Sequence, residues 1–245
     1  MRLIDALLKR ALAESEKKAL GMILAGQVLV NDTPVTKPAT PVSAQDTIRV
    51  RGIKKYVSRA GEKLAGALDA FMFPVENRSF IDIGASTGGF TDVLISRGAA
   101  YVAAVDVGKG LLHQKLRLNP RVEIFEGVDF KNFGAERLHQ KPEAFVADVS
   151  FTSLNLIVEK AFSLLKPVHR KVEGVVLFKP QFELPKAERN LLDKGVLHNE
   201  KRLKQLLHDF ETQMQSLNII IQALIPAAVK GAKGNQEYVA HLTRP

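Results

Sequence analysis

The segment from Phe80 to Gly108, "FIDIGASTGGFTDVLISRGAAYVAAVDVG", limits the possible folds of this chain more than any other segment. An apolar run is followed by a glycine-broken turn, a helical pattern and a second apolar run that ends in an acid at Asp106. Short apolar runs bounded by glycines predict buried strands, and the periodicity between them predicts a helix. This order of strand, glycine turn, helix and strand is typical of a nucleotide-cofactor site.

The chain continues to alternate between strand and helix patterns after this segment. Strands are predicted at 80–83, 101–106, 121–125, 143–147, 173–179, 218–225 and 236–242, and helices at 88–97, 111–117, 153–165 and 199–215. Strands separated by helices imply a mainly parallel sheet with helices on both faces, which is a Rossmann-like α/β architecture. The last two strands instead flank a Gly-rich turn. We expect this domain to cover 79–245.

The first fifty-five residues are predicted to form a separate small α+β domain. "LIDALLKRAL" and "SEKKALGMILAG" carry apolar residues at helical spacing, and Gly26 is well placed to end the second helix. "QVLVNDTPV" then alternates apolar and polar residues around an Asn31-Asp32 turn, and a proline-punctuated loop leads to a last strand. Residues 56–78 would be a linker and a leading helix.

Charge and composition narrow the classes of partner. The net charge is +9, and residues 1–55 carry +5 of it. A basic excess favours polyanions, nucleic acid above all, although a solubility charge without a partner is the alternative. The chain has no cysteine and no run of eighteen apolar residues, and its start is charged throughout. We therefore expect a cytoplasmic protein with no thiolate metal site, no membrane span and no secretory signal.

The glycine turn raises the question of which cofactor it binds. "GASTGG" lies at the carboxyl end of the first strand, where doubly wound sheets bind ligands. A dinucleotide site would have the spacing G-x-G-x-x-G, whereas this turn has G-x-x-x-G-G and is preceded by Asp82. An acid there would repel a pyrophosphate but suits the sulfonium and ammonium groups of S-adenosyl-L-methionine. A tight turn with no ligand is the alternative.

The residues predicted to bind this cofactor come from the ends of three strands. They are Asp82, Gly84, Ala85, Ser86, Thr87, Gly88, Gly89, Phe90, Asp106 and Asp129. Asp106 would bind ribose hydroxyls, and Asp129 would lie where such folds commonly contact the adenine amine. For Asp129, an exposed acid in a turn is an equally weighted alternative.

Four charged residues lie beside strand ends or helix starts, where a role in core packing is hard to argue. They are Lys63, Asp148, Lys179 and Glu237. Asp148 and Lys179 each end an apolar strand, which is the ligand-binding edge of this architecture. A buried charge needs a partner, so structural ion pairs are the alternative to catalysis.

The N-terminal segment "SEKKALGMILAGQVLVNDTPVTKPATPV…DTIRV" resembles the S4-type RNA-binding domain, named for a small-subunit ribosomal protein. The resemblance implies that basic side chains contact an RNA backbone, which makes binding salt-dependent. The candidates, together with a basic linker, are Lys9, Arg10, Lys17, Lys18, Lys37, Arg51, Lys54, Lys55 and Arg59. A solvated helix face is the alternative for any one of these side chains.

"DIGASTGGF" with the four charged residues resembles the FtsJ-type (RrmJ-like) ribose methyltransferases. "YVSRAGEKL", "DVSFTSL", "FKPQFE" and "KGNQEY" make the whole chain similar to the TlyA (hemolysin A) family. The resemblance implies 2′-O-methylation of ribosomal RNA, with cytidine the expected nucleotide, by a Lys-Asp-Lys-Glu tetrad without a metal. Lys179 would face the attacking oxygen, as a base if neutral or as a stabiliser of the developing alkoxide if charged. Lys63, Asp148 and Glu237 would orient it.

Three other functions remain open from the sequence. An RNA-binding or ribosome-assembly factor could keep a catalytically silent methyltransferase fold. A hemolysin is the function that the name hemolysin A suggests, and the absence of a spanning segment counts against it. A NAD-dependent dehydrogenase is disfavoured by Asp82 and by the glycine spacing.

Overall fold

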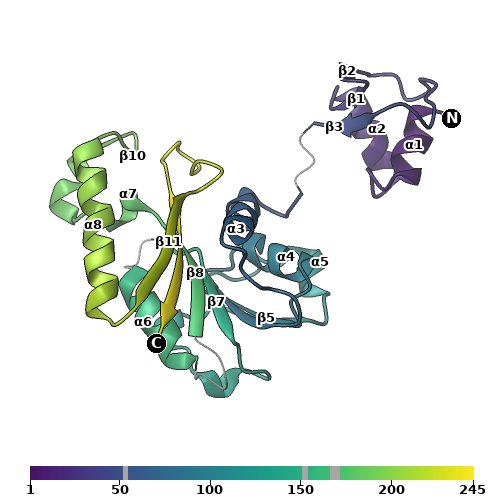
Figure 1. The fold of residues 1–245 in the computed structure, drawn as a ribbon. Coiled ribbons are helices and arrows are strands. Elements are labelled where there is room, and N and C mark those ends of the chain that lie inside the picture. The colour runs from purple at the N-terminus through teal and green to yellow at the C-terminus, as the bar shows by residue number, and fades with distance from the viewer. Residues whose placement is uncertain (52–54, 151–153, 166–171) are drawn as a thin grey trace. The chain divides into compact units, whose positions relative to one another are not determined.

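The computed structural model describes residues 1–51, 55–150, 154–165 and 172–245. It divides the chain into two compact units, Met1–Lys55 and Tyr56–Pro245. Each unit has a hydrophobic core of its own. Figure 1 shows the elements of both units.

The first unit packs two helices against a small antiparallel sheet. Its elements are α1 (Leu3–Lys9), α2 (Glu16–Leu24), β1 (Val28–Val30), β2 (Thr33–Pro34) and β3 (Ile48–Val50). Strand β1 lies in the centre and pairs with both neighbours. The fully buried Leu3, Leu7 and Ile23 come from the helices and form one core with Val28 from the sheet. Apolar spacing on the helices therefore accounts for this small core.

The hairpin between β1 and β2 turns on two residues with positive φ, Asn31 at 50° and Asp32 at 66°. Two left-handed residues make the type of turn that matches the twist of paired strands, and Asn and Asp tolerate it well. The Asn31 side chain also donates to Asp46 Oδ1 and accepts from the Thr47 amide, at 2.8 and 2.9 Å. The turn thus anchors the long loop that leads to β3.

The second unit is built on a seven-stranded sheet with the order β11-β12-β8-β7-β4-β5-β6. Its strands are β4 (Ser79–Ile83), β5 (Tyr101–Asp106), β6 (Val122–Glu126), β7 (Ala144–Ala147), β8 (Val172–Phe178), β11 (Ile220–Pro226) and β12 (Tyr238–Arg244). Strands β4 to β8 pair in parallel, whereas β12 runs antiparallel to both β8 and β11. In Figure 1 the yellow β12 lies between its two partners. The α/β class and the mainly parallel sheet are therefore confirmed.

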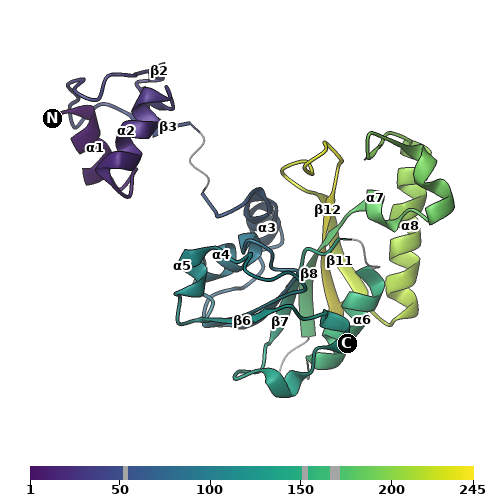
Figure 2. The ribbon, with the colours of Figure 1, turned by 180° about the vertical axis from the view of Figure 1, so that it is seen from behind.

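Helices cover both faces of this sheet (Figure 2). They are α3 (Arg59–Ala70), α4 (Gly89–Ser96), α5 (Gln114–Arg117), α6 (Leu154–Leu164), α7 (Pro180–Glu183) and α8 (Glu200–Ser216). Along β4, Phe80 packs on the face of α3 and α4, while Ile81 and Ile83 pack on the face of α6 and α8. Side chains alternate between faces along a strand, so a strand buried on both faces is apolar almost throughout.

One predicted element is shorter in the structure, and one segment without a predicted element has structure of its own. The helix expected at 111–117 is only the short α5, because the amides of residues 110–112 donate to the Glu126 carboxylate. The segment between α7 and α8 forms a 3₁₀ helix, η3 (Lys186–Leu191), and a hairpin of β9 (Leu192–Asp193) and β10 (Val196–Leu197). Within the described ranges, no helix is long and apolar enough to cross a bilayer.

Candidate active site

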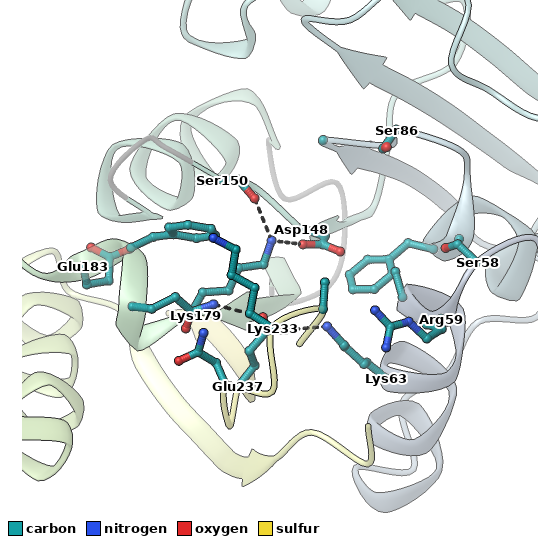
Figure 3. Close-up of a pocket in the computed structure, with 18 of the residues that line it drawn as sticks. Ser58, Arg59, Lys63, Ser86, Asp148, Ser150, Lys179, Glu183, Lys233 and Glu237 are labelled. Atoms are coloured by element: carbon teal, nitrogen blue, oxygen red, sulfur yellow. Dashed lines mark hydrogen bonds and ion pairs between the residues drawn. The ribbon is translucent and has the colours of Figure 1, made fainter. Parts of the chain in front are cut away.

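The four charged residues singled out in the sequence line one cavity of the second unit, with a volume of about 970 Å³. They come from four elements: Lys63 from α3, Asp148 and Lys179 from the residues after β7 and β8, and Glu237 from the residue before β12. Figure 3 shows their side chains turned toward one another. Parallel strands place their carboxyl ends at the same edge of a sheet, and that edge holds this site.

Lys63 and Glu237 form a buried ion pair. Their side chains join Nζ to Oε2 at 2.5 Å, and only 8% and 4% of the two residues are exposed. Removing one member of such a pair leaves an uncompensated buried charge, which costs about 3–5 kcal/mol of stability. The pair therefore fixes α3 against the start of β12 as well as placing two charges in the cavity wall.

Lys179 and Asp148 form the second ion pair, in a less buried position. Lys179 Nζ lies 2.5 Å from Asp148 Oδ1 and donates to the Ser150 hydroxyl at 2.9 Å. The ammonium also lies 5.6 Å from the centre of the Phe182 ring, a cation–π distance. The ion pair, the hydrogen bond and the cation–π contact together hold the Lys179 side chain in one orientation within the cavity.

Gln181 is a wall residue that the sequence analysis did not single out. It lies on the short α7, is 9% exposed and donates from Nε2 to Glu237 Oε1 at 3.1 Å. Helix α7 is only four residues long, which is too short for a repeating apolar pattern to indicate which of its side chains are buried.

The loop "GASTGG" forms another wall. Gly84, Ala85, Ser86, Thr87, Gly89 and Phe90 line the cavity, and Ser86 and Thr87 are exposed. Gly88 does not line it, although it precedes α4 with a φ of 92°.

Two of these glycines bring protein segments together. A Cβ at Gly84, whose φ is 81°, would lie 2.6 Å from the Asp148 carbonyl oxygen. A Cβ at Gly89 would lie 3.0 Å from the Gly61 amide on α3. Close packing at both points needs a residue without a side chain. Because these two positions lack a side chain, the loop can pack closely against the elements that carry Asp148 and Lys63.

Asp82 is fully buried beneath this loop and does not line the cavity. Its Oδ2 accepts from the Thr91 amide and hydroxyl at 2.8 and 2.6 Å, whereas Oδ1 has no hydrogen-bond partner among the described residues. Burial raises the pKa of Asp82 to about 7, against the lowering effect of the Thr91 hydrogen bonds, and the nearby Asp148 and Asp106 raise it further. A buried, unpaired carboxylate oxygen fits a site that receives a cationic ligand.

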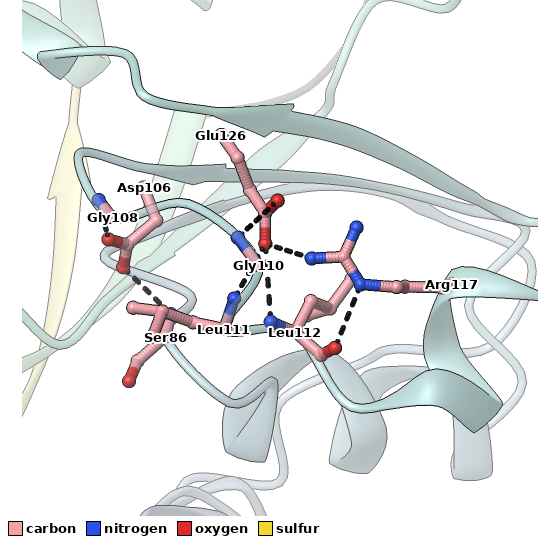
Figure 4. A network of polar contacts seen from close by, with 8 residues as sticks. All are labelled: Ser86, Asp106, Gly108, Gly110, Leu111, Leu112, Arg117 and Glu126. Carbon is pink, nitrogen blue, oxygen red and sulfur yellow. Dashed lines mark hydrogen bonds and ion pairs between the residues drawn. The ribbon is translucent and has the colours of Figure 1, made fainter.

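Asp106 and Glu126 organise the loop that follows β5 (Figure 4). Asp106 accepts from the Ser86 and Gly108 amides at 2.8 and 2.7 Å, one on each oxygen. Each carboxylate oxygen has two lone pairs, so both can still accept from ribose hydroxyls.

Glu126 accepts from the amides of Gly110, Leu111 and Leu112 and from the Arg117 guanidinium. The Arg117 hydrogen bond, followed by the amides, lowers the pKa of Glu126 to about 2 although partial burial opposes this. Glu126 was missed in the sequence analysis, although an acid at the end of a strand was the signal used for Asp106.

Asp129 lies outside the cavity lining. Its side chain accepts from the Lys131 amide at 3.0 Å at the start of the 3₁₀ helix η1 (Phe130–Asn132), and it pairs with Lys131 Nζ at 3.4 Å. A turn-capping role therefore accounts for its observed contacts.

The predicted RNA-binding residues differ in their surroundings. Lys9, Lys17, Lys18, Lys37 and Arg51 are exposed in the first unit, and Arg59 is exposed at the start of α3. Arg10 instead donates to the carbonyls of Asp46 and Ser43 at 2.7 and 2.9 Å, which ties α1 to the loop before β3. Lys55 is exposed as well, whereas Lys54 lies outside the described residues.

Three exposed cations, Arg59, Arg189 and Lys233, also line the cavity. No carboxylate of the described segments lies within ion-pair distance of any of them. In Figure 3, Arg59 and Lys233 lie on opposite sides of Lys63 and Glu237. Unpaired positive charge around a cavity favours a polyanionic ligand.

Comparison with known proteins agrees with this geometry. The family model for FtsJ-like methyltransferases matches residues 56–244, and the S4 domain model matches residues 1–48. The chain is 40% identical to the protein named Hemolysin A from Brachyspira hyodysenteriae over 98% of its own length and 99% of the relative's. It belongs to the TlyA family of FtsJ-like methyltransferases. S-adenosyl-L-methionine is the cofactor of this family.

Other relatives of this TlyA-family chain carry names that describe an activity. The 16S/23S rRNA (cytidine-2′-O)-methyltransferase TlyA of Mycobacterium tuberculosis is 37% identical over 96% of this chain and 87% of the relative. Among solved structures, a hemolysin-named protein from Streptococcus thermophilus matches with a TM-score of 0.73 and 33% identity, over 100% of this chain and 88% of the other. The TlyA-family fold is thus shared over the full chain.

Proposed function

We propose that this protein methylates the 2′-hydroxyl of a ribose in ribosomal RNA, with cytidine as the target nucleotide, using S-adenosyl-L-methionine. The observation that carries the proposal is the convergence of the Lys63–Glu237 and Lys179–Asp148 pairs on one cavity that is also lined by the glycine loop. The name of the Mycobacterium tuberculosis relative supports the substrate class.

The loop and its supporting acids would hold the cofactor. Asp82 has an unpaired buried oxygen, Asp106 has free lone pairs, and Ser86 and Thr87 are exposed in the cavity. These groups fit a ligand that carries an ammonium, a sulfonium and ribose hydroxyls. When bound, the cofactor supplies a methyl group activated by a positively charged sulfur.

Lys179 would act on the attacking oxygen. Its ammonium is paired with Asp148 and held by Ser150, so it is oriented to stabilise negative charge that develops on a ribose oxygen. An ammonium fixed in advance needs no reorganisation during the reaction, which is the main advantage of a preorganised site. Lys63 and Glu237 form the more deeply buried pair. Their side chains would fix the part of the cavity wall that α3 and the start of β12 provide.

RNA would be bound by cations of both units. The exposed Lys9, Lys17, Lys18 and Lys37 would contact phosphates from the S4 domain. Arg59, Arg189 and Lys233 would contact phosphates around the cavity mouth. Contacts of this kind position an RNA without reading its sequence.

The test is transfer of radiolabelled methyl groups from S-adenosyl-L-methionine to ribosomal subunits isolated from a strain that lacks this gene. Wild-type protein should label one or both subunits, and Lys179→Ala should lose at least about 100-fold in rate, as removal of one preorganised electrostatic group does. Lys204→Ala, which changes an exposed lysine of α8 that does not line the cavity, is the matched control. A wild-type protein that binds the cofactor but labels neither subunit would refute the proposal.

A further inference from the structure

Gln181 has two polar atoms in its side chain, and only one of them has a hydrogen-bond partner in the part of the site that the structure describes. Its Nε2 donates to Glu237 Oε1 at 3.1 Å, while the other oxygen of Glu237 is paired with Lys63. The amide oxygen of Gln181, Oε1, is buried and has no hydrogen-bond donor among the described residues. Gln181 is more than nine-tenths buried and still lines the cavity.

A buried amide oxygen without a donor is uncommon, because burial removes its water and nothing replaces the lost hydrogen bond. Rotating the amide by 180° would give no relief, since the oxygen of Gln181 would then face the carboxylate of Glu237. The contact with Glu237 therefore fixes which end of the amide faces away from it. An acceptor fixed in this way in the wall of a cavity indicates a ligand that brings a donor.

We propose that Gln181 is a fifth functional residue, whose Oε1 accepts a hydrogen bond from the ribose 2′-hydroxyl that is to be methylated. This inference rests on the proposed function, because that reaction brings one hydroxyl to the tetrad. The Lys179 ammonium would donate to the same oxygen, and Gln181 would accept its proton in a hydrogen bond. One lone pair would then be left to point at the methyl group, so the two residues together orient the nucleophile. As the oxygen–carbon bond forms and the carbon–sulfur bond breaks, the hydroxyl proton would leave to solvent, since an amide oxygen orients a proton without taking it up.

The experiment compares Gln181→Met, which removes both polar atoms at similar volume, with wild-type protein and Gln222→Met. Gln222 donates to the Thr243 hydroxyl at 2.9 Å on strand β11 and does not line the cavity, so it controls for loss of a glutamine hydrogen bond. We expect Gln181→Met to lower kcat for methyl transfer to ribosomal subunits about 10- to 100-fold, since two hydrogen bonds in the site are lost. The Kd for S-adenosyl-L-methionine, measured by calorimetry, should change less than about twofold.

A second variant keeps the proposal falsifiable if Gln181→Met folds poorly. Protonated Gln181→Glu has a donor for Glu237 and an acceptor for the hydroxyl, as glutamine does, whereas the ionised form places two carboxylates side by side. The ratio of variant to wild-type kcat should therefore rise as the pH falls, by about tenfold per unit until the carboxyl is protonated. A residue that only packs would give a ratio that does not change with pH.

Three outcomes would overturn the inference. Gln181→Met could equal wild type in kcat, or it could lose cofactor affinity, in which case Oε1 serves the cofactor. The kcat ratio for Gln181→Glu could also stay flat with pH. In each case wild-type protein still transfers methyl groups, whereas failure of the proposed function would appear as absent transfer by wild type.

Discussion

Glu237 and Lys63 are 174 residues apart in the sequence, yet their side chains join at 2.5 Å inside the second unit. This contact connects the first helix of the methyltransferase domain with the start of its last strand. The Lys63–Glu237 pair should therefore affect two properties that can be measured separately, the stability of the fold and the rate of methyl transfer.

The pair can be tested with a double-mutant cycle. Lys63→Met and Glu237→Gln should each lower the free energy of unfolding by about 3–5 kcal/mol, because each leaves the other charge buried and unpaired. The double variant should recover at least about half of the summed loss, yet remain without methyl transfer. Urea denaturation and the subunit labelling assay measure the two properties. Additive losses of stability would contradict the buried pair.

Asp82 should make the folded protein less stable as the pH rises, which is the reverse of the usual effect of a carboxyl group. Its pKa in the folded protein is about 7, above the ordinary value of 3.8, so the folded state binds more protons than the unfolded state between these values. Stability contributed by the protonated form is full below about pH 4 and is lost as the pH rises through 7.

Asp82→Asn should therefore gain stability over wild type as the pH rises from 4 to 8, by up to about 4 kcal/mol. The same substitution should weaken binding of S-adenosyl-L-methionine, because it removes the negative charge. Denaturation at several pH values, with calorimetry for the cofactor, checks both. A stability difference that is constant with pH would contradict the buried, titrating carboxyl.

Glu126 should support cofactor binding without contacting the cavity. Glu126→Gln removes the charge that holds the amides of residues 110–112 and Arg117, which should cost about 1–3 kcal/mol of stability. Because this loop adjoins Asp106, we expect the Kd for S-adenosyl-L-methionine to rise about tenfold. Glu136→Gln, on an exposed 3₁₀ turn, is the control. Unchanged cofactor affinity would limit Glu126 to a structural role.

Lys233 and Arg189 should contribute to RNA binding through charge alone. Replacing either by Ala should weaken binding of ribosomal RNA and reduce the slope of log K against log salt by about 0.7–0.9. Lys204→Ala should leave the slope unchanged. Filter binding at several salt concentrations measures it. An effect on affinity without a change in slope would show that these side chains do not contact phosphates.

The sequence indicated the parts of the site that follow strand ends. Asp148, Lys179 and Asp106 each close an apolar run, so the position of the carboxyl edge followed from the parallel sheet. The roles of the glycines were harder to infer, because Gly84 and Gly89 relieve contacts between protein segments that are distant in the sequence. Periodicity carries no information about such contacts.

Residues whose role depends on a partner elsewhere in the fold were not accessible in the same way. Arg10 has the appearance of a solvated cation directly after α1, yet it donates to carbonyls more than thirty residues later. Gln181 lies on a four-residue helix, where neither burial nor orientation can be inferred from spacing. Local pattern thus predicts elements and edges, whereas tertiary contacts decide which polar groups are engaged.

The most direct test of the central claim is the position of the transferred methyl group. Ribosomal RNA labelled by wild-type protein is digested to nucleosides, and mass spectrometry then separates methylation of the ribose from methylation of the base. We predict a nucleoside methylated at the 2′-oxygen, formed by wild type and by Lys204→Ala but not by Lys179→Ala. A methyl group on the base, or a 2′-O-methyl product that Lys179→Ala still forms at the wild-type rate, would contradict it.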